Sequence, residues 1–175
     1  MADRRPIQQA HERAYVDYFL SWFNHTYHCK FKVVSEPNPP EAIISSSRTT
    51  RWIEVSTAFW NKAYAQDLYS HATPDEKHMP VGPGPFQDMD REFAQNFVSV
   101  VKKKLEKKSY LMWRDLLGRG YLLIPIMHPW FDGHTVKLMR DAWEVCSINN
   151  LDCFRSIYIA FHSLNKIRFT RWPNK

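Results

Sequence analysis

Two glutamates, Glu41 and Glu54, lie in or beside segments whose other residues favour burial. Glu54 is flanked by Ile53 and Val55, and Glu41 directly follows Pro40. An isolated ionised carboxylate is costly in apolar surroundings, so such an acid needs a partner or a shifted pKa. A divalent cation is a suitable partner, because Mg²⁺ is typically held by one or two carboxylates and several waters. The residue types therefore indicate a metal site in which the two acids share an ion.

The positions of these two acids predict that they lie on a β-hairpin. Residues 41–45 and 51–57 have strand patterns, and the polar stretch 46–50 between them has hairpin spacing. Neighbouring antiparallel strands would bring both carboxylates to one edge of a sheet. The alternative is that each acid forms an ordinary ion pair with an arginine of the hairpin, Arg48 or Arg51.

A third acid, Glu12, lies on the first predicted helix, residues 7–23. Glu12 precedes Tyr15 by three residues, which sets it along the apolar face of that helix. Glu12 is therefore a candidate third ligand. The alternative is a surface acid that pairs with Arg13 or Arg5.

The remaining segments alternate between strand and helix patterns. We expect strands at 30–34, 121–127, 154–162 and 166–172, and helices at 58–69, from 90 to about 117, and at 134–147. A Pro- and Gly-rich stretch, 73–88, is expected to be a loop. This order predicts an α/β fold, one domain over residues 1–175, with a mixed central sheet flanked by helices on both faces. Neither G-x-G-x-x-G nor G-x-x-x-x-G-K occurs, which argues against Rossmann and P-loop nucleotide binding.

The composition is that of a folded protein with a positive excess. The hydrophobic share of 44% excludes a disordered chain, and the net charge of +6 favours a polyanionic partner such as nucleic acid, although a solvated basic face would also explain it. No apolar stretch is long enough to span a membrane, and the start lacks the apolar core of a secretory signal. The three cysteines show no close pairing, which suits a reducing compartment. We therefore expect a cytoplasmic protein without a membrane partner.

On these residues the sequence resembles the PD-(D/E)XK nucleases, the restriction-endonuclease-like phosphodiesterases. The likeness rests on Pro40-Glu41-Ala42-Ile43-Ile44, on Trp52-Ile53-Glu54-Val55-Ser56 after a hairpin, and on the preceding helix with Glu12. A helix with a Lys-rich stripe that leads to the core strand Tyr121-Leu122-Leu123-Ile124 extends the likeness over most of the chain.

The resemblance implies a restriction-endonuclease-like fold and a site for Mg²⁺ or Mn²⁺. Glu41 matches the first motif acid, Glu54 matches the (D/E) of (D/E)XK, and Glu12 matches the helical acid of many members. The family pattern places a catalytic Lys where this chain has Ser56, whose hydroxyl supplies no positive charge. The best replacement on the following long helix is Lys104, which borders its apolar face.

By this resemblance the chain is expected to be a Mg²⁺-dependent nuclease acting on DNA or RNA, with Glu41, Glu54 and Lys104 as catalytic residues. Basic residues expected to hold the phosphate backbone are Arg48, Arg51, Lys102, Lys103, Lys107 and Lys108. Many members dimerise, so a homodimer is compatible with the likeness. The alternative, favoured by Ser56, is a non-catalytic module on the same fold that binds nucleic acid or a protein. Nothing positive supports a small-molecule enzyme.

Two further clusters carry no recognisable ligand motif. His25, His28 and Cys29 lack the second ligand pair that zinc sites usually have. His128 and His134 follow a core strand, where α/β proteins often bind ligands, but a turn leading into a helix explains that segment as well.

Overall fold

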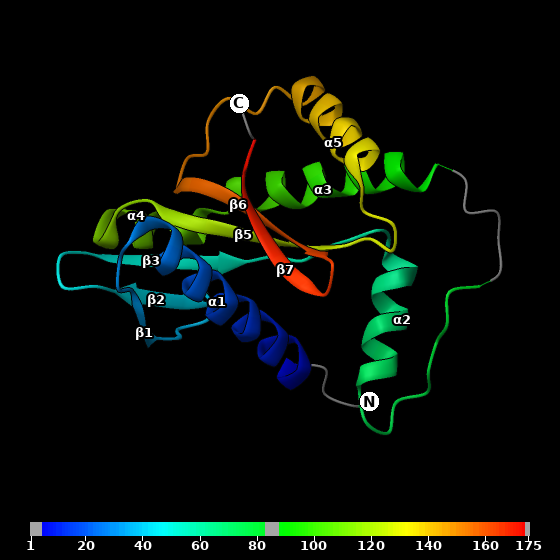
Figure 1. Cartoon of the computed structure of the whole chain (residues 1–175), viewed down its shortest axis with the longest axis horizontal. Helices are drawn as coiled ribbons and strands as arrows, with labels where there is room; N and C mark the ends of the chain where they lie inside the picture. Colours follow the sequence, from blue (N-terminus) through cyan, green and yellow to red (C-terminus); the bar gives the residue numbers. More distant parts are fainter. Residues whose placement is uncertain (1–4, 83–87, 174–175) are drawn as a thin grey trace.

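A seven-stranded mixed sheet forms the centre of the protein (Figure 1). The computed structural model describes residues 5–82 and 88–173. The strands are β1 (Lys32–Ser35), β2 (Ala42–Ser45), β3 (Thr50–Val55), β4 (Ala58–Phe59), β5 (Gly120–Met127), β6 (Phe154–Ser163) and β7 (Lys166–Trp172). The helices are α1 (Arg5–Tyr27), α2 (Lys62–Ala72), α3 (Met89–Leu105), α4 (Leu111–Leu117) and α5 (Gly133–Val145), with a 3-10 turn, η1, at Lys108–Tyr110.

The strand order is β1-β2-β3-β5-β6-β7, with the short β4 pairing with β5. β3, β5 and β6 are parallel, whereas the β1–β2, β2–β3 and β6–β7 pairs are antiparallel. The predicted hairpin, the mixed sheet and the strands at 121–127, 154–162 and 166–172 are therefore confirmed.

Each face of the sheet is covered by helices, as the sequence predicted. α1 covers one face, where Phe19 packs against the rings of Tyr121 and Tyr158. α3 and α5 lie side by side over the other face, where Phe97 and Leu122 share a core (Figure 1). Successive residues of a strand face opposite sides, so each strand contributes to both cores.

The predicted helix from 90 to about 117 is wrong as a continuous element, because α3 ends at Leu105. The apolar row of α3 has Ser109 as its next position, so a longer helix would bury nothing more. Continuation would also stack like charges four residues apart, Lys103 over Lys107 and Lys104 over Lys108. The chain instead becomes extended at Lys107 and turns through η1 into α4.

The predicted helix at 58–69 starts later than expected. Ala58 and Phe59 form β4, which pairs with the end of β5. The Asn61 side chain then accepts a hydrogen bond from the Tyr64 N–H at 2.8 Å, and this cap starts α2 at Lys62. In the expected loop 73–88, residues 73–82 have no helix or strand, and 83–87 lie outside the described residues.

Every helix in the described part of the chain is too short or too polar to cross a membrane.

The packing of Trp52 predicts that Gly120 cannot be replaced without loss of stability. A Cβ at Gly120 would lie 2.3 Å from the buried Trp52 ring, which is also held by a hydrogen bond from Nε1 to the Gly118 carbonyl at 2.8 Å. We expect Gly120→Ala to lower the free energy of unfolding by about 1–3 kcal/mol in a urea titration. Gly133→Ala, where a Cβ meets nothing within 4 Å, is the control. Equal stability of the two variants would contradict this packing.

Candidate active site

The central feature of the site is Glu54 on β3, whose side chain is 1% exposed. Lys104 Nζ lies 2.5 Å from Glu54 Oε1, and the Tyr110 hydroxyl donates a hydrogen bond to the same oxygen at 2.6 Å. The second oxygen, Oε2, is buried and has no hydrogen-bond partner among the described residues. The Glu54 carboxylate is therefore paired through Oε1, whereas Oε2 has no partner among the described residues.

The local fold explains why these groups meet. Trp52 belongs to the core on the α3 side, and alternation along β3 turns Glu54 to that side as well. Lys104 is in the last turn of α3. The turn that follows α3 carries Tyr110 back against the sheet, where its ring stacks on Trp52 at a centroid distance of 5.6 Å. Burial, followed by the charge of Glu54, raises the pKa of Tyr110 above its usual range, so its hydroxyl remains a donor.

Glu41 lies beside this pair. The β2–β3 register pairs Ala42 with Ile53, which sets Glu41 opposite Glu54, and directly opposed residues share a face of the sheet. Burial raises the pKa of Glu41 to about 7, and the charges of Glu12 and Glu54 add to the shift, while Lys104 opposes it. Glu41 is therefore an acid that ionises near neutral pH, and a further positive charge beside it would favour its ionised form.

Glu12 of α1 is the third acid, 8% exposed, and accepts a hydrogen bond from Gln8 Nε2 at 2.8 Å. Burial raises its pKa, the Gln8 hydrogen bond and Lys104 lower it, and the charge of Glu54 raises it further. Three acids and one lysine thus act on one another electrostatically, and their metal-binding and catalytic roles stay predictions.

The alternative ion pairs of Arg13, Arg48 and Arg51 do not form in the described part of the chain. The Arg5 side chain, the other alternative partner of Glu12, lies outside the described residues. Arg13 binds Glu36, with Nη1 2.7 Å from Oε1, and not Glu12. Arg51 donates from Nη1 to the carbonyls of Thr50 and Leu117, at 2.9 and 3.4 Å.

Arg48 is exposed in the β2–β3 turn, whereas the four predicted backbone-binding lysines lie in the last turn of α3 and directly after it. All four are exposed: Lys102, Lys103, Lys107 and Lys108. Lys107 Nζ lies 5.1 Å from the centroid of the Tyr110 ring, so this basic surface borders the acid cluster.

Ser56, at the position of the motif lysine, is half-buried, and its N–H donates to the Leu123 carbonyl at 2.9 Å. The cation beside Glu54 therefore comes from α3 and not from β3. Tyr110 was not predicted as a site residue. The signal for it was the end of the apolar row of α3, which forces the chain to turn before residue 110.

Among residues 5–82 and 88–173, no three His, Cys, Asp or Glu side chains are arranged to hold a metal ion together. The acids of this site therefore do not form a closed metal cage. What they offer is an unpaired, buried carboxylate oxygen on Glu54 with Glu41 opposite, and two carboxylates completed by water are a common Mg²⁺ arrangement.

Without the Lys104 ammonium, the buried charge of Glu54 should destabilise the folded protein. We expect Lys104→Met to lower the free energy of unfolding by about 3–5 kcal/mol, because it leaves an unpaired charge inside the protein. The double variant Glu54→Gln/Lys104→Met should recover most of that loss, since both charges are then gone. Denaturant titrations measure all three proteins, with Lys137→Met on the exposed face of α5 as control. A Lys104→Met variant as stable as Lys137→Met would show that the pair does not hold the site together.

The raised pKa of Glu41 predicts a pH-dependent stability difference. Its folded pKa of about 7 exceeds the ordinary glutamate pKa of 4.5, so ionisation opposes folding increasingly as the pH rises between these values. Glu41→Gln removes that penalty and should be more stable than wild type by about 1–3 kcal/mol near pH 8, with the gap narrowing toward pH 5. Unfolding titrations at both pH values test this, with Glu144→Gln as an exposed control. A stability difference between Glu41→Gln and wild type that is the same at both pH values would refute the raised pKa of Glu41.

Comparison with known proteins identifies no relative of this chain. No protein-family model, no curated protein and no solved structure matches the chain.

Proposed function

We propose that this protein is a Mg²⁺-dependent nuclease with a restriction-endonuclease-like fold, which hydrolyses phosphodiester bonds of DNA or RNA. The observation that carries the proposal is the 2.5 Å contact between Lys104 and the buried Glu54, with Glu41 opposite. In the PD-(D/E)XK pattern an acid pair and a lysine work together, and here the lysine position holds Ser56. Lys104 supplies from α3 the positive charge that β3 lacks.

The acid cluster suits a hard divalent cation. The unpaired Oε2 of Glu54 is a ligand atom without a partner among the described residues, and an added positive charge would favour the ionised form of Glu41. Glu41 and Glu54 would hold the ion, with Glu12 acting through water. When bound, Mg²⁺ supplies a more acidic water and neutralises charge on the phosphate.

The protein's own groups have separate roles in this proposal. Lys104 places an ammonium where charge develops on the phosphate, an electrostatic effect that is strong because the site is largely shielded from water. Tyr110 is a positioning residue, because its hydroxyl holds Glu54 Oε1 and leaves Oε2 without a hydrogen-bond partner among the described residues. The exposed lysines beside the site contact phosphates without regard to sequence: Lys102, Lys103, Lys107 and Lys108.

A second candidate function is a non-catalytic module that binds nucleic acid. It is favoured by the tight engagement of Lys104 with Glu54 and by the absence, within the described ranges, of a three-residue metal group. In such a module the ion pair is structural and the basic surface alone is used.

Cleavage of a supercoiled plasmid and of single-stranded DNA and RNA tests the nuclease. We expect cleavage with Mg²⁺ or Mn²⁺, none in chelator, and a loss of at least about 10²-fold in Glu54→Gln and Lys104→Met. Glu41→Gln is the most informative variant, because it should lose cleavage while its stability near pH 8 increases. Glu144→Gln and Lys137→Met are the exposed controls.

Two results would contradict the nuclease. One is equal cleavage by wild type and Glu54→Gln. The other is binding that falls steeply with salt, shows no dependence on metal and is accompanied by no cleavage, which is the behaviour of the binding module.

A further inference from the structure

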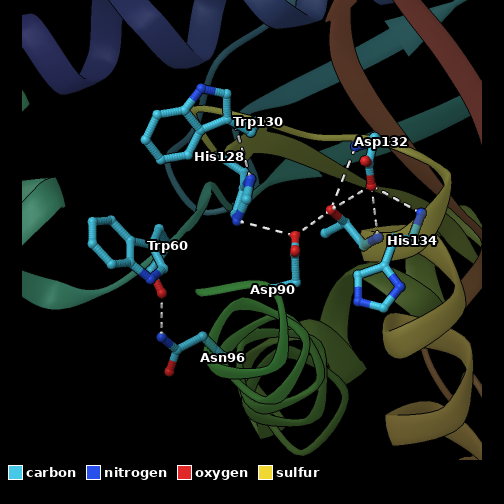
Figure 2. Close-up of polar contacts among 8 residues, drawn as sticks. Trp60, Asp90, Asn96, His128, Trp130, Asp132 and His134 are labelled. Carbon is cyan, nitrogen blue, oxygen red and sulfur yellow. Dashed lines mark hydrogen bonds and ion pairs between the residues drawn. The ribbon is translucent and has the colours of Figure 1, made fainter. Parts of the chain in front are cut away.

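A polar cavity lies at the opposite end of α3 from Lys104, where β5 ends. Its volume is about 550 Å³, within the range of small-ligand sites. Its lining includes Asp90, Arg91, His128, Trp130 and His134. Figure 2 shows the His128 ring and the Asp90 carboxylate facing each other, with the Trp130 indole beside His128. The cavity lies beyond the carboxyl end of a parallel strand, where open α/β sheets commonly bind ligands.

His128 provides a buried ring N–H that has only a long contact with the Asp90 carboxylate and no hydrogen bond of ordinary geometry. Its side chain is 1% exposed, and Nδ1 accepts a hydrogen bond from the Trp130 N–H at 3.2 Å. The neutral ring therefore carries its proton on Nε2. This atom lies 3.5 Å from Asp90 Oδ1 and makes no hydrogen bond within the described residues. An unmet buried donor is costly, and a ligand acceptor in the cavity would satisfy it.

Asp90 provides an acceptor that is already fixed in place. Its Oδ1 accepts a hydrogen bond from the Thr135 hydroxyl, and Thr135 is fully buried in the capping box that Asp132 forms at the start of α5. The Asp90 side chain is 32% exposed. The carboxylate is therefore held rigidly between α3 and α5 while still accessible to a ligand.

Trp130 adds a flat apolar surface beside this donor and acceptor. It is 65% exposed, although large aromatic rings are usually buried. An aromatic face is a stacking platform for a nucleobase, whichever base is present.

We propose that this cavity binds one nucleobase with an exocyclic amino group, which stacks on Trp130, donates its amino hydrogen to Asp90 and accepts from His128 Nε2. A carboxylate accepts from an amino group such as that of cytosine, whereas uracil has a carbonyl oxygen at the same position, which Asp90 repels. In this proposal the base is part of a bound nucleic-acid strand, so the inference rests on the proposed nucleic-acid function. A free nucleotide offers the same chemistry.

The distance between the His128–Asp90 pocket and the Glu54 site fits a single nucleic-acid strand that contacts both. Asp90 and Lys104 lie in the first and last turns of α3, which separates them by ~21 Å at 1.5 Å per residue. Along β5, Leu122 is the register partner of Glu54, and His128 lies ~20 Å further on the same face. About six nucleotides at duplex spacing cover that distance. An exposed polar row of α3 connects the two ends: Arg91, Gln95, Ser99 and Lys102.

Titrations of the full chain with CMP and UMP in chelator test the pocket without any cleavage. We expect wild type to bind CMP about tenfold more tightly than UMP, and Trp130→Ala to weaken CMP by about tenfold. Asp90→Asn should abolish the preference, because an amide can donate to the uracil oxygen. Tyr18→Ala, which removes a ring that is 52% exposed on α1, is the matched control and should behave as wild type. Thermal melts verify that each variant is folded.

A parallel titration with a single strand of about twelve nucleotides separates this proposal from the proposed function. CMP binding with the expected variant effects, but no strand binding, keeps the pocket as a free-nucleotide site and refutes the nuclease. Strand binding and cleavage with no effect of Trp130→Ala or Asp90→Asn on either ligand refutes the pocket alone. Equal affinity of wild type for CMP and UMP, or no binding of either, also overturns it.

Discussion

The structure depends on a negative charge that is almost fully buried. Glu54 is 1% exposed, and an unpaired carboxylate in that position would offset a large part of the stability of a domain of this size. Lys104 and Tyr110 stabilise this charge through one carboxylate oxygen, Oε1, only. A purely structural ion pair would be expected to satisfy both oxygens, whereas the unpaired Oε2 and the raised pKa of Glu41 leave the site electrostatically incomplete. Our proposal is that a divalent cation completes it.

α3 organises the face of the molecule on which both candidate sites lie. Its apolar row packs over β5, its last turn delivers Lys104 to Glu54, and its first turn delivers Asp90 to His128. The two sites are therefore fixed at the ends of one rigid element and on the same face of the sheet. The turn after Leu105 matters as much as the helix, because it returns Tyr110 to the core and leaves the neighbouring lysines exposed.

Local sequence patterns were sufficient for most of the fold. Alternation and apolar runs predicted β5, β6 and β7, and the polar stretch 46–50 predicted the hairpin that sets Glu41 opposite Glu54. The long helix was predicted too far, because periodicity alone does not weigh the lost burial at Ser109 against lysines stacked four residues apart. The pocket of His128 and Asp90 was not predicted, since it exists only where the end of β5 meets the start of α3. The catalytic and metal-binding roles of the acids stay predictions.

The most direct measurement is anomalous scattering from crystals of the protein soaked in Mn²⁺ near pH 8, where Glu41 is mostly ionised. This account predicts an anomalous peak between the carboxylates of Glu41 and Glu54, in contact with the oxygen that Lys104 and Tyr110 leave free. Crystals in which both carboxylates are ordered and no peak lies between them would contradict it, and Glu54 would then be a structural ion pair only.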